Sequence, residues 1–246
     1  MRRGWESQAQ NWASFARTAG ADWAHDHINL PALRELLPPP GDRSLDLACG
    51  EGRLTRLLGS LAHRVAGADA SPSMVALARA HPDAEPTVVA DAGALPFRDG
   101  SFDFVLAYMC LHDIDDMPRA VAEAARVLAP AGRLLVAITH PLNTAGAFAS
   151  REDDAPFVIA GSYFEPAPLT MVAERDGFSL TFHSEHRPLE AYARAAEQAG
   201  LLIEALREVA VPATVAAAER RGRRWQRVPL FLHLLMRKPG SPPMGR

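Results

Sequence analysis

The stretch from Ser44 to Leu58, with the sequence SLDLACGEGRLTRLL, constrains the fold of this chain more than any other segment. An apolar run that carries one acid, Asp46, meets the glycine turn Gly50-Glu51-Gly52, and a helical pattern begins at Arg53. A strand, a tight glycine turn and a helix in this order are how a doubly wound α/β sheet presents a nucleotide site. Glycine is needed because the backbone turns sharply and a ligand approaches it closely.

Two nucleotide ligands compete for this turn. A dinucleotide places its pyrophosphate on the helix N-terminus, but its fingerprint requires a third glycine where this chain has Thr55. Asp46, just before the turn, would also repel a phosphate. S-Adenosylmethionine instead has no phosphate and carries a sulfonium and an ammonium, which a neighbouring carboxylate suits. The charges around the turn therefore favour S-adenosylmethionine.

The segment Asp46–Gly52 resembles the first motif, D-x-A/G-C-G-x-G, of class I S-adenosylmethionine-dependent methyltransferases. Asp69 ends a second apolar run 19 residues after Gly50, where an acid can bind both ribose hydroxyls. Three later segments follow in the order of the family's motifs. They are similar to its adenine-binding turn (residues 88–97), its fourth strand (residues 101–107) and its R-V-L-x-P-G-G passage (residues 124–136, with Ala131 in place of the first glycine).

The resemblance covers residues 40–140 well and implies an α/β fold with a doubly wound, Rossmann-like, seven-stranded sheet. It also implies S-adenosylmethionine as the cofactor, S-adenosylhomocysteine as the product, and a small-molecule enzyme similar to the type 11 group. The cofactor-binding residues that it implies are Asp46, Ala48, Gly50, Gly52, Asp69, Ala70, Met74, Asp91, Ala92, Tyr108, Trp12 and Arg17.

Length and composition are those of a single domain. The chain has 246 residues, of which 48% are apolar, and a net charge of −3, so a large core is possible and general nucleic-acid binding is not expected. No apolar run reaches the ~20 residues of a membrane span, and residues 1–10 lack the apolar region of a secretory signal. We expect a cytoplasmic monomer or homodimer with a small-molecule substrate, in which Cys49 and Cys110 are reduced core thiols.

Residues 1–40 are predicted to form a helical cover. Tryptophan and alanine residues recur at helical spacing, which predicts one amphipathic helix over residues 5–17. In related methyltransferases an N-terminal helix closes over the cofactor. The resemblance therefore implies that Trp12, Phe15 and Arg17 form the cover, with Arg17 at the methionine carboxylate. The alternative is a helix that only packs its aromatic residues on the sheet edge.

Residues 141–187 depart from the simple alternation of strands and helices. Thr170–Glu174 and Phe178–His183 flank Asp176-Gly177 with alternating apolar residues, which predicts a β-hairpin. An insertion after the fifth strand lies over the substrate side of a methyltransferase sheet, so we interpret it as a lid that selects the substrate. The alternative is a β-flap that caps the core or mediates dimerisation. Residues 238–246 are predicted to be a disordered tail.

Two charged clusters have simple explanations. Several arginines surround Trp225, and such a run is usually a solvated face; contact with an anionic substrate or nucleic acid is the alternative. Asp113, Asp115 and Asp116 invite a metal site, but they stand just before a predicted helix. We therefore expect them to cap the helix and offset its dipole, and we predict no metal.

Methyl transfer from a sulfonium is an in-line displacement, in which the enzyme holds the nucleophile about 3 to 3.5 Å from the methyl carbon and excludes water. A hydroxyl or amine nucleophile must also lose a proton, and histidine suits this near neutral pH. We expect His140, after the fifth strand, to be the base, then His112, after the fourth, with Tyr108 as a hydrogen-bond donor. Each histidine has a structural alternative, such as capping a helix. The lower-ranked candidates are His186, His25 and His27.

The predicted function is S-adenosylmethionine-dependent methyl transfer to an oxygen, nitrogen or carbon nucleophile of a small molecule. The high alanine and arginine content suits a high-GC bacterium and a step of secondary metabolism. Two alternatives from other classes remain. An NAD-dependent oxidoreductase is disfavoured by Asp46. A non-catalytic, cofactor-binding regulator would have His140 and His112 buried and fully hydrogen-bonded.

Overall fold

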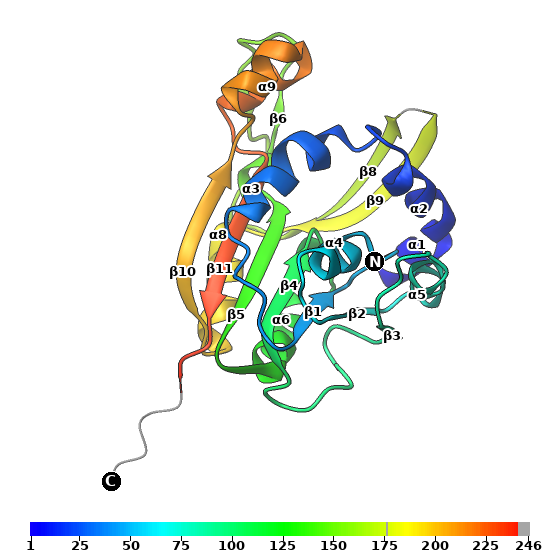
Figure 1. Ribbon diagram of the computed structural model, residues 1–246. Coiled ribbons are helices and arrows are strands. Elements are labelled where there is room, and N and C mark those ends of the chain that lie inside the picture. Colours follow the sequence, from blue (N-terminus) through cyan, green and yellow to red (C-terminus); the bar gives the residue numbers. More distant parts are fainter. Residues whose placement is uncertain (176, 241–246) are drawn as a thin grey trace.

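The computed structural model describes residues 1–175 and 177–240, and within them seven strands form one sheet in the order β10-β11-β5-β4-β1-β2-β3 (Figure 1). The strands from β3 to β5 run parallel, whereas β11 is antiparallel to both of its neighbours. The predicted doubly wound α/β fold with seven strands is confirmed. The strands are β1 (Ser44–Leu47), β2 (Val65–Asp69), β3 (Thr87–Val89), β4 (Phe102–Tyr108), β5 (Leu128–Thr139), β10 (Leu202–Val209) and β11 (Phe231–Arg237).

Helices cover both faces of this sheet, and β4 shows why the chain folds in this way. Successive side chains of a strand point to opposite faces. Val105 and Ala107 belong to a core cluster with α6 and α8, whereas Phe104 and Leu106 belong to a second cluster with α3 and α4. A central parallel strand must therefore be apolar on both faces, as β4 is. The helices are α1 (Arg2–Ser7), α2 (Ala9–Arg17), the π-helix η1 (His25–Asn29), α3 (Leu30–Arg34), α4 (Arg53–Ser60), α5 (Pro72–Arg79), the 3-10 helix η2 (Leu111–Asp113), α6 (Met117–Val127), α7 (Pro141–Ala145), α8 (Leu189–Gln198), α9 (Ala213–Ala218) and the 3-10 helix η3 (Arg220–Gln226).

The predicted N-terminal helix over residues 5–17 is two helices, α1 and α2, which meet at Gln8. Gln8 leaves the helical conformation with φ −114° and ψ 13°. Its side-chain amide bonds the backbone of Thr181 twice, donating to the carbonyl and accepting from the N–H at 3.1 Å. The single-helix prediction is wrong because this distant strand holds Gln8, a contact that helical periodicity does not reveal.

The predicted hairpin is present and longer than expected: β8 (Ala167–Arg175) pairs antiparallel with β9 (Phe178–His186). Gly177 adopts φ 82°, a conformation that glycine takes without strain, whereas Asp176 of the predicted turn lies outside the described residues. Phe182 of β9 contacts the rings of Trp5 and Trp12 edge-on, with centroids 6.1 and 6.0 Å away. We call α1, α2, β8 and β9 together the roof; Figure 1 shows the hairpin beside α1 and α2.

The chain between α7 and β8 forms a small two-stranded sheet of β6 (Ala147–Phe148) and β7 (Phe157–Val158), which docks against η3. Arg220 pairs with Glu152 at 3.2 Å and Arg223 pairs with Asp153 at 3.4 Å. These two exposed arginines therefore bind the loop between β6 and β7, so the interpretation of the arginine run as a purely solvated face is too simple.

The C-terminal end of the described chain is held in place at Lys238. Its Nζ donates to the carbonyls of Ala125 and Leu128, at 2.8 and 2.7 Å. The disordered tail predicted for residues 238–246 therefore does not begin at Lys238, and residues 241–246 lie outside the described part of the chain.

Cys49 and Cys110 are free thiols and buried, as expected. In the residues described, no helix combines the length and apolar character that crossing a membrane requires.

Candidate functional site

A cavity of about 1140 Å³ lies at the carboxyl ends of β1, β2, β4 and β5, under the roof. Residues of the glycine turn, such as Gly50, form one wall, and residues of α7 and η3, such as Asn143 and Trp225, form another. Trp12 of α2 and Phe182 of β9 line it from the roof. This is the edge at which an open α/β sheet binds its ligands.

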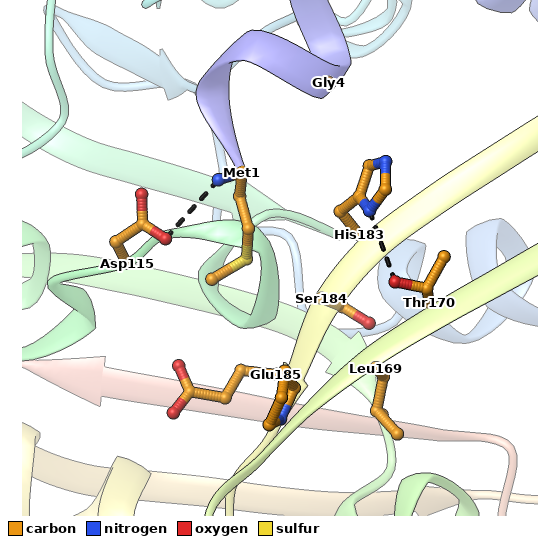
Figure 2. Close-up of a pocket in the computed structure, with 9 residues that line it drawn as sticks. Met1, Gly4, Asp115, Leu169, Thr170, His183, Ser184 and Glu185 are labelled. Atoms are coloured by element: carbon orange, nitrogen blue, oxygen red, sulfur yellow. Dashed lines mark hydrogen bonds and ion pairs between the residues drawn. The ribbon is translucent and has the colours of Figure 1, made fainter.

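A smaller pocket of about 490 Å³, shown in Figure 2, marks one side of the roof, where α1, the link before α6 and the hairpin meet. The Met1 nitrogen is 3.5 Å from Asp115, and Thr170 Oγ1 of β8 is 3.4 Å from His183 Nδ1 of β9. A Cβ on Gly4 would lie 2.6 Å from the His183 ring, so glycine allows α1 to approach β9 closely. These contacts close the roof along this side.

The glycine turn leaves room for a ligand. Gly50 and Gly52 have φ values of 55° and 85°, which favour glycine, and a Cβ on Gly50 would meet no atom within 4 Å. Ala48, also at a positive φ of 55°, lines the cavity together with Gly50. The space beside the turn is therefore open, as a bound nucleoside requires.

Asp46 lies beneath this turn and is only 1% exposed. Thr55 Oγ1 donates a hydrogen bond of 2.7 Å to its carboxylate. Burial raises the pKa of Asp46 to about 7, against this hydrogen bond and with help from the nearby charge of Asp69. Thr55, at the position where a dinucleotide fingerprint has its third glycine, therefore donates a hydrogen bond that favours the ionised form of Asp46. A bound cation would favour the ionised carboxylate further.

Asp69 and Asp91 stand at the ends of β2 and β3, as predicted. The Asp69 carboxylate accepts from the backbone N–H groups of Gly50 and Ser71, both at 2.8 Å, and Asp91 accepts from Gly93 at 2.8 Å. Burial raises the pKa of Asp69. These bonds fix the carboxylates, and each oxygen keeps a lone pair for a ligand hydroxyl or amine. The predicted cofactor residues that line the cavity are Asp46, Ala48, Gly50, Asp69, Ala70, Met74, Asp91, Ala92, Tyr108 and Trp12.

Arg17 does not line the cavity, in contrast to the prediction. Its guanidinium bonds Glu51, which is 1% exposed, at 2.8 Å and the carbonyl of Leu77 at 2.9 Å, so it fastens α2 to the glycine turn. A cation that does line the cavity next to the turn is Arg53, which the sequence did not single out; it is paired with Asp22 at 3.0 Å. Its position as the first helical residue after the turn was the signal that could have found it.

His140, our first choice of base, is a structural residue. Its Nδ1 accepts from the Leu142 N–H at 3.0 Å and caps α7, and its Nε2 lies 3.0 Å from Glu208. It is 4% exposed and is not among the residues that line the cavity. His186 is similarly engaged, by Thr144 at 2.7 Å and the Tyr163 carbonyl at 2.9 Å. Both ring nitrogens of each histidine are occupied, so neither is placed to take a proton from an acceptor.

His112, on η2 after β4, does line the cavity. Its Nδ1 is buried and has no hydrogen-bond partner in the described structure, and its Nε2 is 3.6 Å from Asp113. Burial, assisted by the charge of Arg187, lowers the pKa of His112 to about 4, so its imidazole is neutral at pH 7. Burial raises the pKa of Asp113 to about 8, against a hydrogen bond from Trp5.

The predicted capping role of the acidic residues before α6 applies to Asp116, which accepts from the Arg119 N–H at 3.1 Å. Asp113 lies instead in the site, beside His112, and Asp115 is exposed with a side chain that is 73% accessible. Within residues 1–175 and 177–240, no group of three or more histidine, cysteine, aspartate or glutamate side chains is arranged to hold a metal.

Tyr108 lies at the end of β4, and its hydroxyl is 2.7 Å from His25 Nδ1. Burial, together with the charge of Arg53, lowers the pKa of His25 to about 4, whereas burial raises that of Tyr108. The Tyr108 hydroxyl therefore shares a hydrogen bond with a neutral imidazole, and both residues line the cavity. His27 is exposed and lies outside the lining.

Comparison with known proteins agrees with this geometry. Residues 45–136 match the family model described as a methyltransferase domain. The demethylmenaquinone methyltransferase of Thermus thermophilus is 44% identical over 112 residues, which is 43% of this chain and 50% of that protein. The 2-phytyl-1,4-naphtoquinone methyltransferase of Thermosynechococcus vestitus is 36% identical over 114 residues, 44% of this chain and 51% of that protein. This chain thus spans about half the length of these curated relatives.

Among solved structures, an S-adenosylmethionine-dependent methyltransferase from Mesorhizobium loti superimposes with a TM-score of 0.71. It is 27% identical, and the match covers 85% of this chain and 96% of that chain. The segment that the family model matches holds Asp46, the glycine turn, Asp69 and Asp91, whereas the roof, α7 and η3 lie outside it. An open turn beside buried carboxylates fits S-adenosylmethionine, and residues 45–136 form a methyltransferase domain similar to those of S-adenosylmethionine-dependent enzymes.

Proposed function

We propose that this protein transfers the methyl group of S-adenosylmethionine to a small, planar, largely apolar acceptor. The single observation that carries this proposal is the continuity of the cavity. It runs from the cofactor wall at Gly50 and Asp69 to a second wall that contains Tyr108 and Trp225. At about 1140 Å³, it exceeds the ~300 to 1,000 Å³ of common small-molecule pockets, which leaves room for an acceptor beside the cofactor.

The second wall is apolar and aromatic. Trp23, Met109, Trp225, Leu230 and Phe231 line it and pack around one core cluster. Met109 has a φ of 52°, an uncommon conformation for a residue with a side chain, and such backbone strain is concentrated at functional sites. A flat ring suits this wall. The names of two relatives, which methylate demethylmenaquinone and 2-phytyl-1,4-naphtoquinone, support a ring-containing acceptor.

When bound, S-adenosylmethionine supplies an electrophilic methyl group and leaves as the neutral thioether S-adenosylhomocysteine. Asp46 and Asp69 hold the cationic donor, and the roof acts as the lid that excludes water. An acceptor hydroxyl that received this methyl group would have to lose its proton in the same step. That proton would pass to the neutral imidazole of His112, whose Nδ1 has no hydrogen-bond partner within the described residues.

His25 has a different role in this proposal. Because its Nδ1 is occupied by the Tyr108 hydroxyl, it positions Tyr108 against the acceptor rather than taking a proton. A hydroxyl and an amine acceptor would each need a base such as His112, and of the two we propose the hydroxyl. A step in bacterial secondary metabolism remains our proposal for the setting of this reaction.

The test is calorimetry with S-adenosylmethionine and S-adenosylhomocysteine, followed by turnover assays with aromatic hydroxyl compounds. We expect both ligands to bind and a methyl ether to form. If neither ligand binds, the proposed function is wrong. If both bind tightly but no methylated product forms with any ring acceptor, a cofactor-binding regulator is the better description.

A further inference from the structure

The arginines of η3 and of its C-cap, Arg227, differ in what they bind. Arg220 and Arg223 are exposed and paired with Glu152 and Asp153. Arg227 donates to the carbonyls of Asp154 and Ala155. None of these three lines the large cavity. They are accounted for by the docking of η3 on the loop between β6 and β7.

Arg224 differs from these neighbours because it lines the cavity beside Trp225. It donates to the Ser150 carbonyl at 2.9 Å, but no carboxylate of the described residues pairs with it. Its Nε is buried and has no hydrogen-bond partner within the described chain. That atom is shielded from the cavity, whereas Nη2 of Arg224 makes no hydrogen bond within the described chain and is not buried, so the Nη2 edge of the guanidinium is available to a ligand oxygen.

The guanidinium of Arg224 is also held in position. Its Cζ lies 5.4 Å from the centre of the Phe148 ring, and that ring contacts Trp225 edge-on with centroids 4.9 Å apart. Arg227 lies over the same Phe148 ring at 5.5 Å, which adds a second positive charge to this corner. A fixed planar donor beside an aromatic wall is suited to bind an anionic oxygen on a flat ring.

We propose, on the basis of the function proposed above, that the acceptor is an aromatic molecule with an anionic oxygen, which Arg224 binds. The ring lies along the aromatic wall of Trp225 and Phe231, and the carboxylate or ionised hydroxyl accepts from the Nη2 edge of the Arg224 guanidinium. This contact fixes which ring position faces the methyl donor. Arg224 is therefore a specificity-determining residue that no cofactor motif contains.

The test uses two probes of equal shape, 2-naphthoate and 2-naphthamide, on the full chain saturated with S-adenosylhomocysteine. We expect the wild-type protein to bind the acid at least about tenfold more tightly than the amide, because a charge-assisted bond is stronger than a neutral one. Arg224→Met should remove that preference and leave the affinity for the amide within about twofold. Arg224→Lys keeps the charge but not the planar fork, and should be intermediate.

The matched control is Arg223→Met, one residue earlier on η3 and outside the cavity lining. It should leave both probe affinities unchanged. Equal binding of acid and amide to the wild-type protein overturns the inference, as does an Arg224→Met variant that keeps the preference. Should Arg224→Met fail to fold, the wild-type comparison and Arg224→Lys decide. Binding of S-adenosylhomocysteine without any preference for the acid refutes only this inference, whereas no binding of S-adenosylhomocysteine refutes the proposed function.

Discussion

Asp46 is an acid whose burial opposes its own ionisation, so replacing it with asparagine should stabilise the ligand-free protein at alkaline pH. The folded-state pKa is about 7, against an ordinary value of 3.8. The folded protein thus holds a proton that the unfolded chain releases in this interval, and stability must fall as the pH rises through it. The loss of folding stability is small below pH 4 and complete above pH 7.

The size of the effect follows from these values. One pKa unit corresponds to about 1.4 kcal/mol, so the ionisation of Asp46 lowers the free energy of unfolding by about 3 kcal/mol between pH 5 and pH 8. Asp46→Asn cannot ionise and should lack this loss. For a domain of this size, about 3 kcal/mol corresponds to a difference of about 6 to 12 °C in the melting temperature.

The assay is thermal and urea unfolding of both proteins at pH 5 and pH 8 without ligand. The amide itself changes stability at both pH values, so the difference between the two pH values isolates the ionisation. Asp99→Asn is the matched control, because its side chain is 81% exposed; its pH dependence should equal that of the wild type. If Asp46→Asn and the wild type lose the same stability between pH 5 and pH 8, the assignment of the titration to Asp46 is refuted.

The same substitution should lower affinity for the cationic donor. The wild-type affinity for S-adenosylmethionine should increase from pH 6 to pH 8 as Asp46 ionises, and Asp46→Asn should lose this increase, with a weakening of about tenfold at pH 8. S-Adenosylhomocysteine lacks the sulfonium charge and should respond less. Equal pH profiles for the two ligands would contradict a charge contact at the sulfonium.

Three further substitutions separate the roles of the site residues. Asp69→Ala should weaken S-adenosylmethionine and S-adenosylhomocysteine by about tenfold or more, since it removes a carboxylate from the ribose position; unchanged calorimetric affinities would contradict this role. His112→Gln should lower kcat by about a hundredfold or more with the S-adenosylhomocysteine affinity kept, and full turnover in that variant would exclude His112 as the base. His140→Ala should lower the free energy of unfolding by about 1 to 2 kcal/mol through loss of the α7 cap, and a loss of cofactor affinity at constant stability would show that His140 belongs to the site after all.

The donor side of the site could be predicted from the sequence because each of its residues is set by a strand end. Asp46 lies in β1, Asp69 ends β2 and Asp91 follows β3. These three strands lie next to one another in the sheet, so one ordered set of local patterns places all three acids. No distant partner is needed to bring them together.

The errors concern side chains whose partners are distant in the sequence. The position of His140 after β5 suggested a base, but its Nε2 is taken by Glu208, 68 residues later. Arg17 was expected at the methionine carboxylate of the cofactor, but its guanidinium binds Glu51, 34 residues away. Arg224 lies in a run of arginines that look alike in the sequence. It is distinguished only in the structure, where Arg220 and Arg223 pair with acids of the loop before β7. Periodicity and strand order carry no information about such pairings.

The roof has a consequence for how the chain is made. Gln8 bonds Thr181, a residue 173 positions further along, so the two parts of the roof are synthesised far apart in time. Helices of six and nine residues, such as α1 and α2, are too short to persist alone in water. On the ribosome their contacts with the hairpin cannot form until β9 has emerged. Contacts between residues this far apart in the sequence also form late in folding. The cofactor wall at Gly50 and Asp69 should therefore form before the roof covers the cavity.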